Sequence, residues 1–396
     1  MAIGAATEVT ALVTPVTPAA MDRTVLTPIV RRALDVDTAE ILEWRHTPID
    51  YPVVSPLSGG LHRFAGTAVA GDRHMQWSIV LKVVRFPGGE ARDPGALSYW
   101  RREPLVYRSG LLRGLDEGLI APRCFGVEEH AGDTAFLWLE DVADDLGPSW
   151  PPRHYLQVAY HLGRFGGWYA AFDRLPEHSW LGHGMIAAVA NQRGGAMLGL
   201  IRDGETWRHP LVRRAFTEPI AGRLLRLWTE REQLLGALER LPRTLCHFDA
   251  SRHNLIARRA ADGGWKTVAI DWAVTGIGAL GEDLSLLVPS PFFRLEADVA
   301  DLPDHAEHVY QSYLQGLGAA GWSGAAVAVR FAYTVSTALR TVFLSPGLPA
   351  LLDTALGREE EQRWGRPFEA IVLQRARLTY FLLDLADEAR SLLDRL

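Results

Sequence analysis

Cysteine and lysine are scarce in this chain of 396 residues. The chain also has no cluster of basic residues and no long apolar run. The two cysteines, Cys124 and Cys246, stand far apart, which predicts neither a disulfide framework nor a zinc site and favours a reducing cytoplasm. A formal net charge of -6 offers no concentrated basic surface for DNA or RNA. Residues 1–20 lack the basic start of a signal peptide, and no apolar run approaches the ~20 residues that span a bilayer. We therefore expect a cytoplasmic protein with neither nucleic-acid nor membrane partners.

The shortage of lysine makes each remaining lysine informative. Lysine and arginine total 41, and only Lys82 and Lys266 are lysine, which leaves 41 − 2 = 39 arginines. A position that keeps lysine against this bias is a candidate for a site that needs a compact ammonium group rather than a planar guanidinium.

The pattern of the first third predicts mostly β-structure. Extended runs at 51–57, 61–70, 76–86, 123–129 and 134–142 end at glycine- and proline-rich turns, of which 71–73 is typical of a hairpin. Residues 96–112 have helical spacing, with Pro104 marking a first turn or a kink. We expect residues 1–50 to form a tail and a leading helix, and 51–142 to form an antiparallel sheet with one helix.

Residues 143–153, which contain Gly147 and three prolines, form the best boundary in the chain. Beyond it, apolar residues three and four apart predict helices at 155–172, 185–201, 220–241, 325–343 and 368–396, interrupted by β-structure at 244–272. The expected fold is therefore α+β with two lobes: a small antiparallel-sheet lobe, a hinge at 143–153 and a larger, mainly helical lobe at 154–396.

The densest cluster of reactive side chains runs from His247 to Asp271. Asp249 lies in a turn, Asn254 follows five positions later, and Asp271 closes the apolar strand 268–270. Phosphoryl transfer needs a carboxylate that accepts a hydroxyl proton, and Mg²⁺ prefers oxygen ligands from Asp and Asn. A single Asp or Asn in a turn is usually a solvated turn residue, but the combined pattern is hard to obtain by chance.

This segment resembles the catalytic loop and metal-binding Asp of the aminoglycoside phosphotransferase and choline kinase superfamily. Asp271-Trp272, the glycines of 276–281 and Asp283-Leu284 resemble that family's second motif. The resemblance covers roughly residues 50–345 in element order and implies a protein-kinase-like fold, with Asp249 as catalytic base and Asn254 and Asp271 as Mg²⁺ ligands. His247 is expected to support the loop through hydrogen bonds.

The same resemblance implies an ATP site in the first lobe. Lys82 lies midway along the third expected strand, where it would contact phosphates, and Glu103 on the following helix would pair with it. The backbone of a turn made of Ser58, Gly59 and Gly60 could approach the phosphates. Further candidates are the hinge residues Glu140 and Val142, whose backbone would bind adenine, and Arg252 and His253 in the catalytic loop, with Arg252 proposed to act on the transferred phosphate.

The acceptor is expected to be a small molecule with a hydroxyl group. Only a short glycine-rich turn separates Asp271 from the helix at Asp283, which leaves no room for the long activation segment of a protein kinase. Aminoglycosides would need acidic side chains such as Asp301, Asp304, Glu307 or the run 359–361, whereas choline-like amino alcohols would need an aromatic cage. Other antibiotics and sugars also fit, so both resistance and metabolic roles are open, as is the oligomeric state. The alternatives are a non-catalytic pseudokinase and an atypical protein Ser/Thr kinase.

Overall fold

The computed structural model of the protein describes residues 18, 21–50, 55–115, 118–147, 149–172 and 174–396. These residues divide into two units, one comprising the described residues up to Arg92 with Pro122–Asp141, the other comprising Asp93–Ala121 and Val142–Leu396. In the described part of the chain, no helix has the length and apolar character needed to cross a membrane. The α+β class is confirmed, with an antiparallel sheet early in the chain and helices in the later part.

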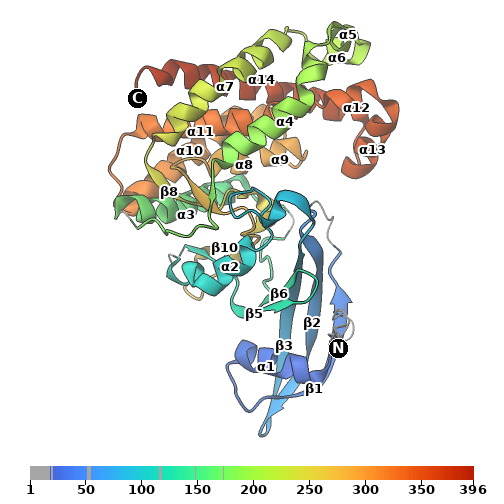
Figure 1. Ribbon diagram of the computed structural model, residues 1–396, viewed down its shortest axis with the longest axis vertical. Coiled ribbons are helices and arrows are strands. Elements are labelled where there is room, and N and C mark those ends of the chain that lie inside the picture. The colour runs from blue at the N-terminus through green and yellow to red at the C-terminus, as the bar shows by residue number, and fades with distance from the viewer. Residues whose placement is uncertain (1–17, 19–20, 51–54, 116–117, 148, 173) are drawn as a thin grey trace, which may run out of the picture. The chain divides into compact units, whose positions relative to one another are not determined.

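The first unit is a five-stranded antiparallel sheet with one helix (Figure 1). Its strands are β1 (Glu40–Pro48), β2 (Ser58–Ala70), β3 (Arg73–Arg85), β5 (Cys124–His130) and β6 (Thr134–Glu140), in the order β1-β2-β3-β6-β5. Side chains alternate along β3, so that Ile79, Leu81 and Val83 are buried, and helix α1 (Arg23–Leu34) buries Leu26 and Val30 in the same core. This core holds the position of every residue on β3, including Lys82.

Strand β1 was not expected, because residues 1–50 were interpreted as a tail and a helix. Its burial alternates poorly: Ile41 is its one fully buried residue, as is typical of an edge strand with one exposed side. The expected strand at 51–57 is not a strand at 55–57, and 51–54 lie outside the described residues. The hairpin at 71–73 is confirmed, since Ala70 pairs with Arg73 across the turn.

The expected helix at 96–112 is much shorter. Helix α2 covers Arg102–Ser109 and is followed by a 3₁₀ turn at Leu111–Gly114. Pro104 lies in the first turn of α2, where its missing N–H would have had no partner within the helix. This helix groups with the second unit rather than with the sheet.

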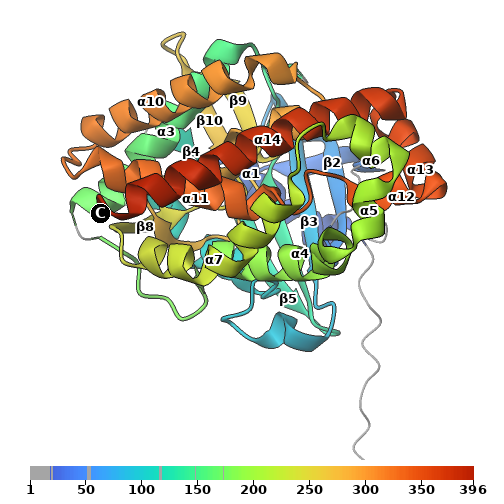
Figure 2. The same ribbon diagram turned by 90° about the horizontal axis from the view of Figure 1, so that it is seen from above.

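The second unit is mainly helical and is built around two long helix pairs. Helix α10 (Leu302–Ala319) packs along α3 (Pro152–Ala171), and α14 (Phe368–Leu393) packs along α11 (Ala326–Thr341) (Figure 2). The remaining helices are α4 (Met185–Arg202), α5 (Gly204–Arg208), α6 (Pro210–Ala215), α7 (Ala221–Glu239), α8 (Leu284–Leu287), α9 (Ser290–Phe293), α12 (Leu348–Leu352) and α13 (Thr354–Trp364). The helices expected at 155–172, 185–201, 220–241 and 325–343 are therefore confirmed within one to three residues at each end, and the one expected at 368–396 ends at Leu393.

Two small sheets in this unit hold the motif residues. One has the order β4 (Leu119–Ile120), β10 (Trp265–Ala269), β9 (Leu255–Arg259), and the other has the order β7 (Gly182–His183), β11 (Gly276–Ala279), β8 (Arg243–Cys246). Residues 276–279 were expected to form a turn, and this expectation was wrong. Gly276 pairs with Gly182 so closely that a Cβ at Gly276 would lie 2.1 Å from the Gly182 carbonyl oxygen, which explains the glycine.

Candidate functional site

The loop between β8 and β9 is anchored by a buried carboxylate that follows it by more than 30 residues. Asp283 accepts hydrogen bonds from the backbone N–H groups of His247 (3.3 Å) and Phe248 (2.7 Å). Phe248 is in the left-handed region with φ 62°, an unusual conformation for a bulky residue that needs such support. Burial raises the pKa of Asp283, while His247 and the two N–H groups act in the opposite direction. Asp283 was expected only to begin a helix, so its role in the loop was missed.

His247 links the loop to the next strand. Its Nδ1 accepts the N–H of Asp249 at 3.1 Å, and its Nε2 lies 2.9 Å from the carbonyl oxygen of Ile270. An accepting Nδ1 requires that Nε2 carries the proton and donates it to Ile270. The ring also packs against Trp272, with centroids 4.6 Å apart. His247 thus supports the loop through hydrogen bonds, as its sequence position predicts.

Asp249, Asn254 and Asp271 lie in one hairpin, near the ends of the paired strands β9 and β10. The side-chain amide of Asn254 donates to the Asp249 carboxylate at 2.7 Å and to the Asp249 carbonyl at 3.1 Å. Asn254 immediately precedes β9, and its carbonyl accepts the N–H of Ile270, which follows the paired strand β10. Asp271 is the next residue and has φ 60°. Asn254 therefore lies beside the candidate base, and Asp271 follows the strand paired with β9; about one third of the Asp249 side chain is exposed.

Two arginines beside Asp249 were not found from the sequence. Arg340 on α11 places Nη2 3.8 Å from Asp249 Oδ1, and Arg193 on α4 donates to the backbone carbonyl of Arg340 at 2.6 Å. In a chain with this many arginines, neither residue has a sequence signal that singles it out. Their position follows only from the packing of α4 and α11 around the loop.

The turn after β10 is held by two residues at the start of α2. Glu103 is buried, and its carboxylate accepts the N–H of Trp272 at 3.3 Å, directly after Asp271. Arg102 is fully buried and donates to five carbonyl groups, including those of Ala273 and Trp180. Burial lowers the pKa of Arg102 to about 10, so it remains charged at neutral pH. The sequence singled out Glu103 but not Arg102, and the expected pair of Glu103 with Lys82 stays a prediction.

Arg252 and His253 are engaged on the other side of the loop. The Arg252 guanidinium donates to the carbonyl oxygen of Gly147 and forms an ion pair with Asp144 at 3.1 Å, above the ring of Trp150. His253 Nε2 lies 2.9 Å from a carboxylate oxygen of Glu296. These contacts give Arg252 a role in fixing the loop to residues 144–150. Its contact with a transferred phosphate stays a prediction.

The candidate nucleotide-binding residues of the first unit lie close together on its sheet. Lys82 on β3 pairs with Leu61 on β2, so the three residues 58–60 precede the position opposite the lysine. They are not a turn between strands: they begin β2 and form a bulge. Gly60 has φ 118°, a backbone conformation that L-residues rarely adopt. Such a bulge leaves the ladder irregular beside Lys82.

The hinge candidates fall at the end of β6. Glu140 is the last residue of β6, where its backbone N–H donates to the carbonyl of Arg123 at 2.8 Å. Asp141 binds Arg63 at 2.7 Å and Ser78 at 2.5 Å. Val142 is the first residue after the boundary between the two units. The carbonyl of Glu140 and the N–H of Val142 remain the predicted adenine contacts.

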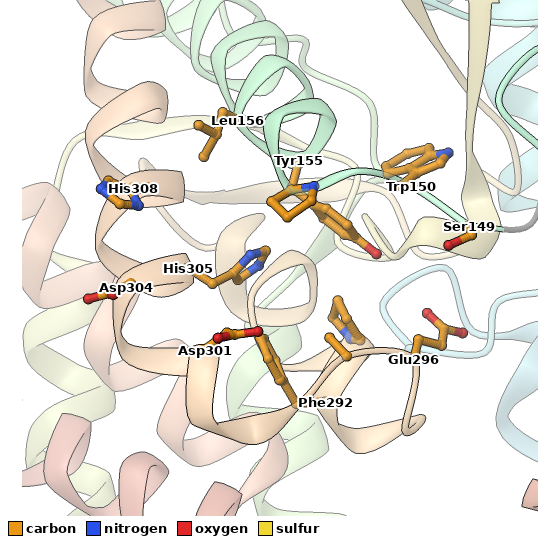
Figure 3. A pocket seen from close by; sticks show the side chains of 13 residues that line it. Ser149, Trp150, Tyr155, Leu156, Phe292, Glu296, Asp301, Asp304, His305 and His308 are labelled. Carbon is orange, nitrogen blue, oxygen red and sulfur yellow. The ribbon is translucent and has the colours of Figure 1, made fainter.

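The helical unit contains a cavity of about 400 Å³ beside the Arg252–His253 side of the loop (Figure 3). Residues from the start of α3, from α9 and from the start of α10 line it. The rings of Tyr155 and His305 pack edge to face, with their centroids 5.1 Å apart. Its acidic side chains are Glu296, Asp301 and Asp304, and none of the described residues that line it is a lysine or arginine. Burial lowers the pKa of His305 to about 4, so this ring is neutral at pH 7.

Two other acidic candidates do not line this cavity. Glu307 pairs with Arg330 at 2.8 Å. In the run 359–361, Glu360 pairs with Arg375 at 2.7 Å and Glu361 accepts the N–H of Phe368 at 2.7 Å. These carboxylates hold helices together, so Asp301 and Asp304 are the members of the expected acidic set that line the cavity.

The oxygen atoms around Asp249 fit a hard divalent cation. Asn254 uses its amide nitrogen as a donor to Asp249, which leaves its amide oxygen as the atom that can bind a cation. The Asp271 carboxylate follows on the adjacent strand end, and carboxylate and amide oxygens are the ligands that Mg²⁺ prefers. Within the described residues, no cluster of three or more His, Cys, Asp or Glu side chains forms a metal site made by protein alone. Mg²⁺ bound to a nucleotide needs only one or two carboxylates, which matches this set.

Several solved structures are similar to this chain over most of its length. Among solved structures, a spectinomycin phosphotransferase in complex with ADP and spectinomycin is 12% identical, covering 94% of this chain and 99% of that chain with a TM-score of 0.43. An aminoglycoside phosphotransferase from Alicyclobacillus acidocaldarius is 13% identical (86% and 94% covered, TM-score 0.43). An ethanolamine kinase from Plasmodium vivax is also 13% identical (85% and 81% covered, TM-score 0.43).

The assignment of the chain to a protein family comes from its sequence. No curated protein matches the chain significantly. The model of the phosphotransferase enzyme family, however, matches residues 110–327, which is more than half of the chain and contains Asp249, Asn254 and Asp271. The protein therefore belongs to the phosphotransferase enzyme family.

Proposed function

We propose that this phosphotransferase transfers the γ-phosphoryl group of ATP to a hydroxyl group of a small molecule. The observation that supports the proposal is the hydrogen bond from Asn254 to Asp249 at 2.7 Å, in a hairpin whose second strand is followed by Asp271. A general base beside two oxygen ligands is the minimum set that phosphoryl transfer to a hydroxyl needs.

Asp249 would act as the general base. Its carboxylate is partly exposed, and the hydrogen bond from Asn254 together with the backbone bond to His247 fixes its orientation. One oxygen could then accept the proton of an acceptor hydroxyl as the oxygen of that hydroxyl attacks phosphorus. Positioning accounts for most of the catalysis in this reaction, because little covalent chemistry is left to the protein.

Asn254 and Asp271 would hold Mg²⁺, which when bound neutralises charge on the phosphates. Lys82 would contact the phosphates from β3, with the backbone of the 58–60 bulge near it. Glu103 would keep the turn after Asp271 in place through its bond to Trp272. The carbonyl of Glu140 and the N–H of Val142 would bind adenine.

The cavity beside the catalytic loop supports an acceptor that carries a protonated amine on a ring or other apolar frame. Three carboxylates line it next to the rings of Trp150 and Tyr155, and the described part of its lining has no Lys or Arg side chain. Aromatic faces and carboxylates attract ammonium groups. Among the acceptors expected from the sequence, aminoglycosides and amino alcohols carry such amines, whereas neutral sugars do not.

A small acceptor also agrees with the segment after Asp271. Strand β11 and helix α8 occupy residues 276–287, so the chain returns to the core without an activation segment. No disulfide joins Cys124 and Cys246, which suits the reducing cytoplasm where ATP is available.

The proposal is tested by ATP consumption with a panel of hydroxyl compounds, paired with and without an amine, in the presence and absence of Mg²⁺. We expect turnover with an amine-bearing member and loss of at least ~10²-fold of kcat in Asp249→Asn, whose amide cannot accept the proton. Asp301→Asn should raise KM for the same acceptor. Preferred turnover of aminoglycosides would indicate a role in antibiotic resistance. Unchanged turnover in Asp249→Asn would exclude the proposed base.

A further inference from the structure

The chain directly after strand β6 is tied to two other strands of the sheet by one carboxylate. Asp141 accepts two hydrogen bonds from the Arg63 guanidinium on β2, at 2.7 Å and 3.0 Å, and one from the Ser78 hydroxyl on β3 at 2.5 Å. The Asp141 side chain is mostly buried, whereas that of Arg63 is partly exposed. A bidentate pair with a third hydrogen bond fixes both carboxylate oxygens, which a surface ion pair with a single contact does not.

This network lies on the same face of the sheet as Lys82. Arg63 on β2 is directly opposite Val80 on β3. Ser78 precedes Val80 by two residues and Lys82 follows it by two, so these side chains point to one face, away from the apolar core that β3 shares with α1. Ser78 and Lys82 are separated by about 13 Å of strand, which is of the order of the length of a nucleoside triphosphate.

Asp141 stands between the two peptide groups that are predicted to bind adenine. The carbonyl of Glu140 belongs to the peptide bond before the Asp141 Cα, and the N–H of Val142 belongs to the one after it. Each peptide group is planar, so the two backbone torsions of Asp141 set the directions of these groups relative to one another. Glu140 is anchored as well, because its carboxylate accepts the N–H of Arg123 at 3.1 Å. Fixing the Asp141 side chain therefore restricts both groups.

We propose that Arg63 and Ser78, acting through Asp141, position the backbone that binds the adenine base and so strengthen binding of the base rather than of the phosphates. This assignment rests on the proposed ATP-dependent function. A donor and an acceptor that already point in the bound direction lose little conformational freedom when the base binds, and this saving appears as affinity. Arg63 and Ser78 are positioning residues, because the role requires no contact between them and the nucleotide.

The first test compares ATP with tripolyphosphate, which carries the phosphates without a base, by isothermal titration calorimetry of the full chain with Mg²⁺. Arg63→Met should weaken ATP binding by about tenfold and leave tripolyphosphate binding unchanged. Arg92→Met is the matched control, because it removes another bidentate ion pair of the same unit, with Asp133, and should change neither affinity. An equal loss for both ligands, or an unchanged affinity for ATP, would overturn the assignment.

A smaller change checks the result independently of how well Arg63→Met folds. Ser78→Ala removes one hydroxyl from the exposed face of β3 and leaves the ion pair in place. It should weaken ATP binding by about threefold, again without an effect on tripolyphosphate. An ATP affinity equal to that of the wild type would remove Ser78 from the proposal.

A double variant decides whether Arg63 acts through Asp141. Asp141→Ala removes all three hydrogen bonds, so adding Arg63→Met to it should weaken ATP binding no further. If the losses of the two single variants added up, Arg63 would contact the nucleotide itself, and the positioning role would be refuted.

Kinetics separate this inference from the proposed function. With an acceptor found for the wild type, Arg63→Met should raise the KM for ATP and leave the KM for the acceptor unchanged. Equal ATP affinities of the wild type and Arg63→Met would refute the role of Arg63 alone. A wild type that does not bind ATP would refute the proposed function itself.

Discussion

Glu282 makes the stability of this protein depend on pH in a way that one substitution should remove. It is buried beside Asp283, accepts the N–H of Ala279 at 2.6 Å, and has its closest arginine, Arg243, at 3.8 Å. Burial is the largest cause that raises its pKa from the ordinary 4.5 to about 7, and the negative charge of Asp283 adds to it. In Glu282→Gln the side chain keeps its shape and its oxygen can still accept the Ala279 N–H.

The sign and size of the effect follow from the raised pKa. A group whose pKa is higher in the folded state contributes stability that is complete below its unfolded pKa and is lost as pH rises through the folded pKa. For Glu282 this window runs from pH 4.5 to about 7, a difference of 7 − 4.5 = 2.5 pH units. At ~1.4 kcal/mol per unit, the wild type should lose on the order of 3 kcal/mol across it. Glu282→Gln should lose less, because glutamine does not ionise.

The assay is urea unfolding followed by tryptophan fluorescence, at several pH values from 4.5 to 8. The difference in unfolding free energy between Glu282→Gln and the wild type should be small near pH 4.5 and should grow in favour of the variant toward pH 8. Glu282→Gln also loses the weak contact with Arg243, which lowers the stability advantage of the variant by a constant amount at high pH. If the unfolding free energies of the two proteins changed in parallel with pH, burial would not raise the pKa of Glu282, and the reasoning would be refuted.

Three further substitutions test how the site is held. Asp283→Asn should destabilise the protein by ~1–3 kcal/mol and reduce turnover, since one loop N–H loses its acceptor; urea unfolding and kcat measure both. Gly276→Ala should cost ~1–3 kcal/mol or more because its Cβ meets backbone, whereas Gly199→Ala, with open space around it in a helix, should stabilise slightly; equal melting temperatures would contradict this. Arg102→Met should lower the melting temperature by several degrees, as five carbonyl groups lose their donor, and wild-type stability would contradict that role.

Local spacing accounts for what could be predicted at the site. Asp249 and Asn254 are five residues apart in one loop. Strand β9 begins directly after Asn254 and pairs with β10, which Asp271 follows, so a single hairpin carries all three residues. Lys82 could be assigned to a strand because alternating apolar neighbours define β3. Helices α3, α4, α7 and α11 were predicted for the same reason, since their 3.6-residue pattern is also local.

The errors arose where an element has little apolar pattern of its own. Strand β1 lies at the edge of its sheet and buries little. Three of the four residues of β11 are small, which allows close contact with the neighbouring backbone at Gly276, and its glycines were interpreted as a turn. In both cases pairing with a neighbouring strand decides the conformation, and pairing of this kind leaves no periodic apolar signal in the strand itself.

The sequence by itself determined the α+β class, the phosphotransferase family and the hairpin that carries the candidate base and its oxygen ligands. Only the tertiary structure decided what surrounds them. Asp283 accepts a hydrogen bond from the loop at Phe248. Arg340 on α11 lies beside Asp249, and Arg193 on α4 donates to the backbone carbonyl of Arg340. The reason is physical: hydrogen bonds within a turn depend on neighbouring residues, whereas the charge around a buried carboxylate depends on helices whose arrangement is set by packing of the whole unit.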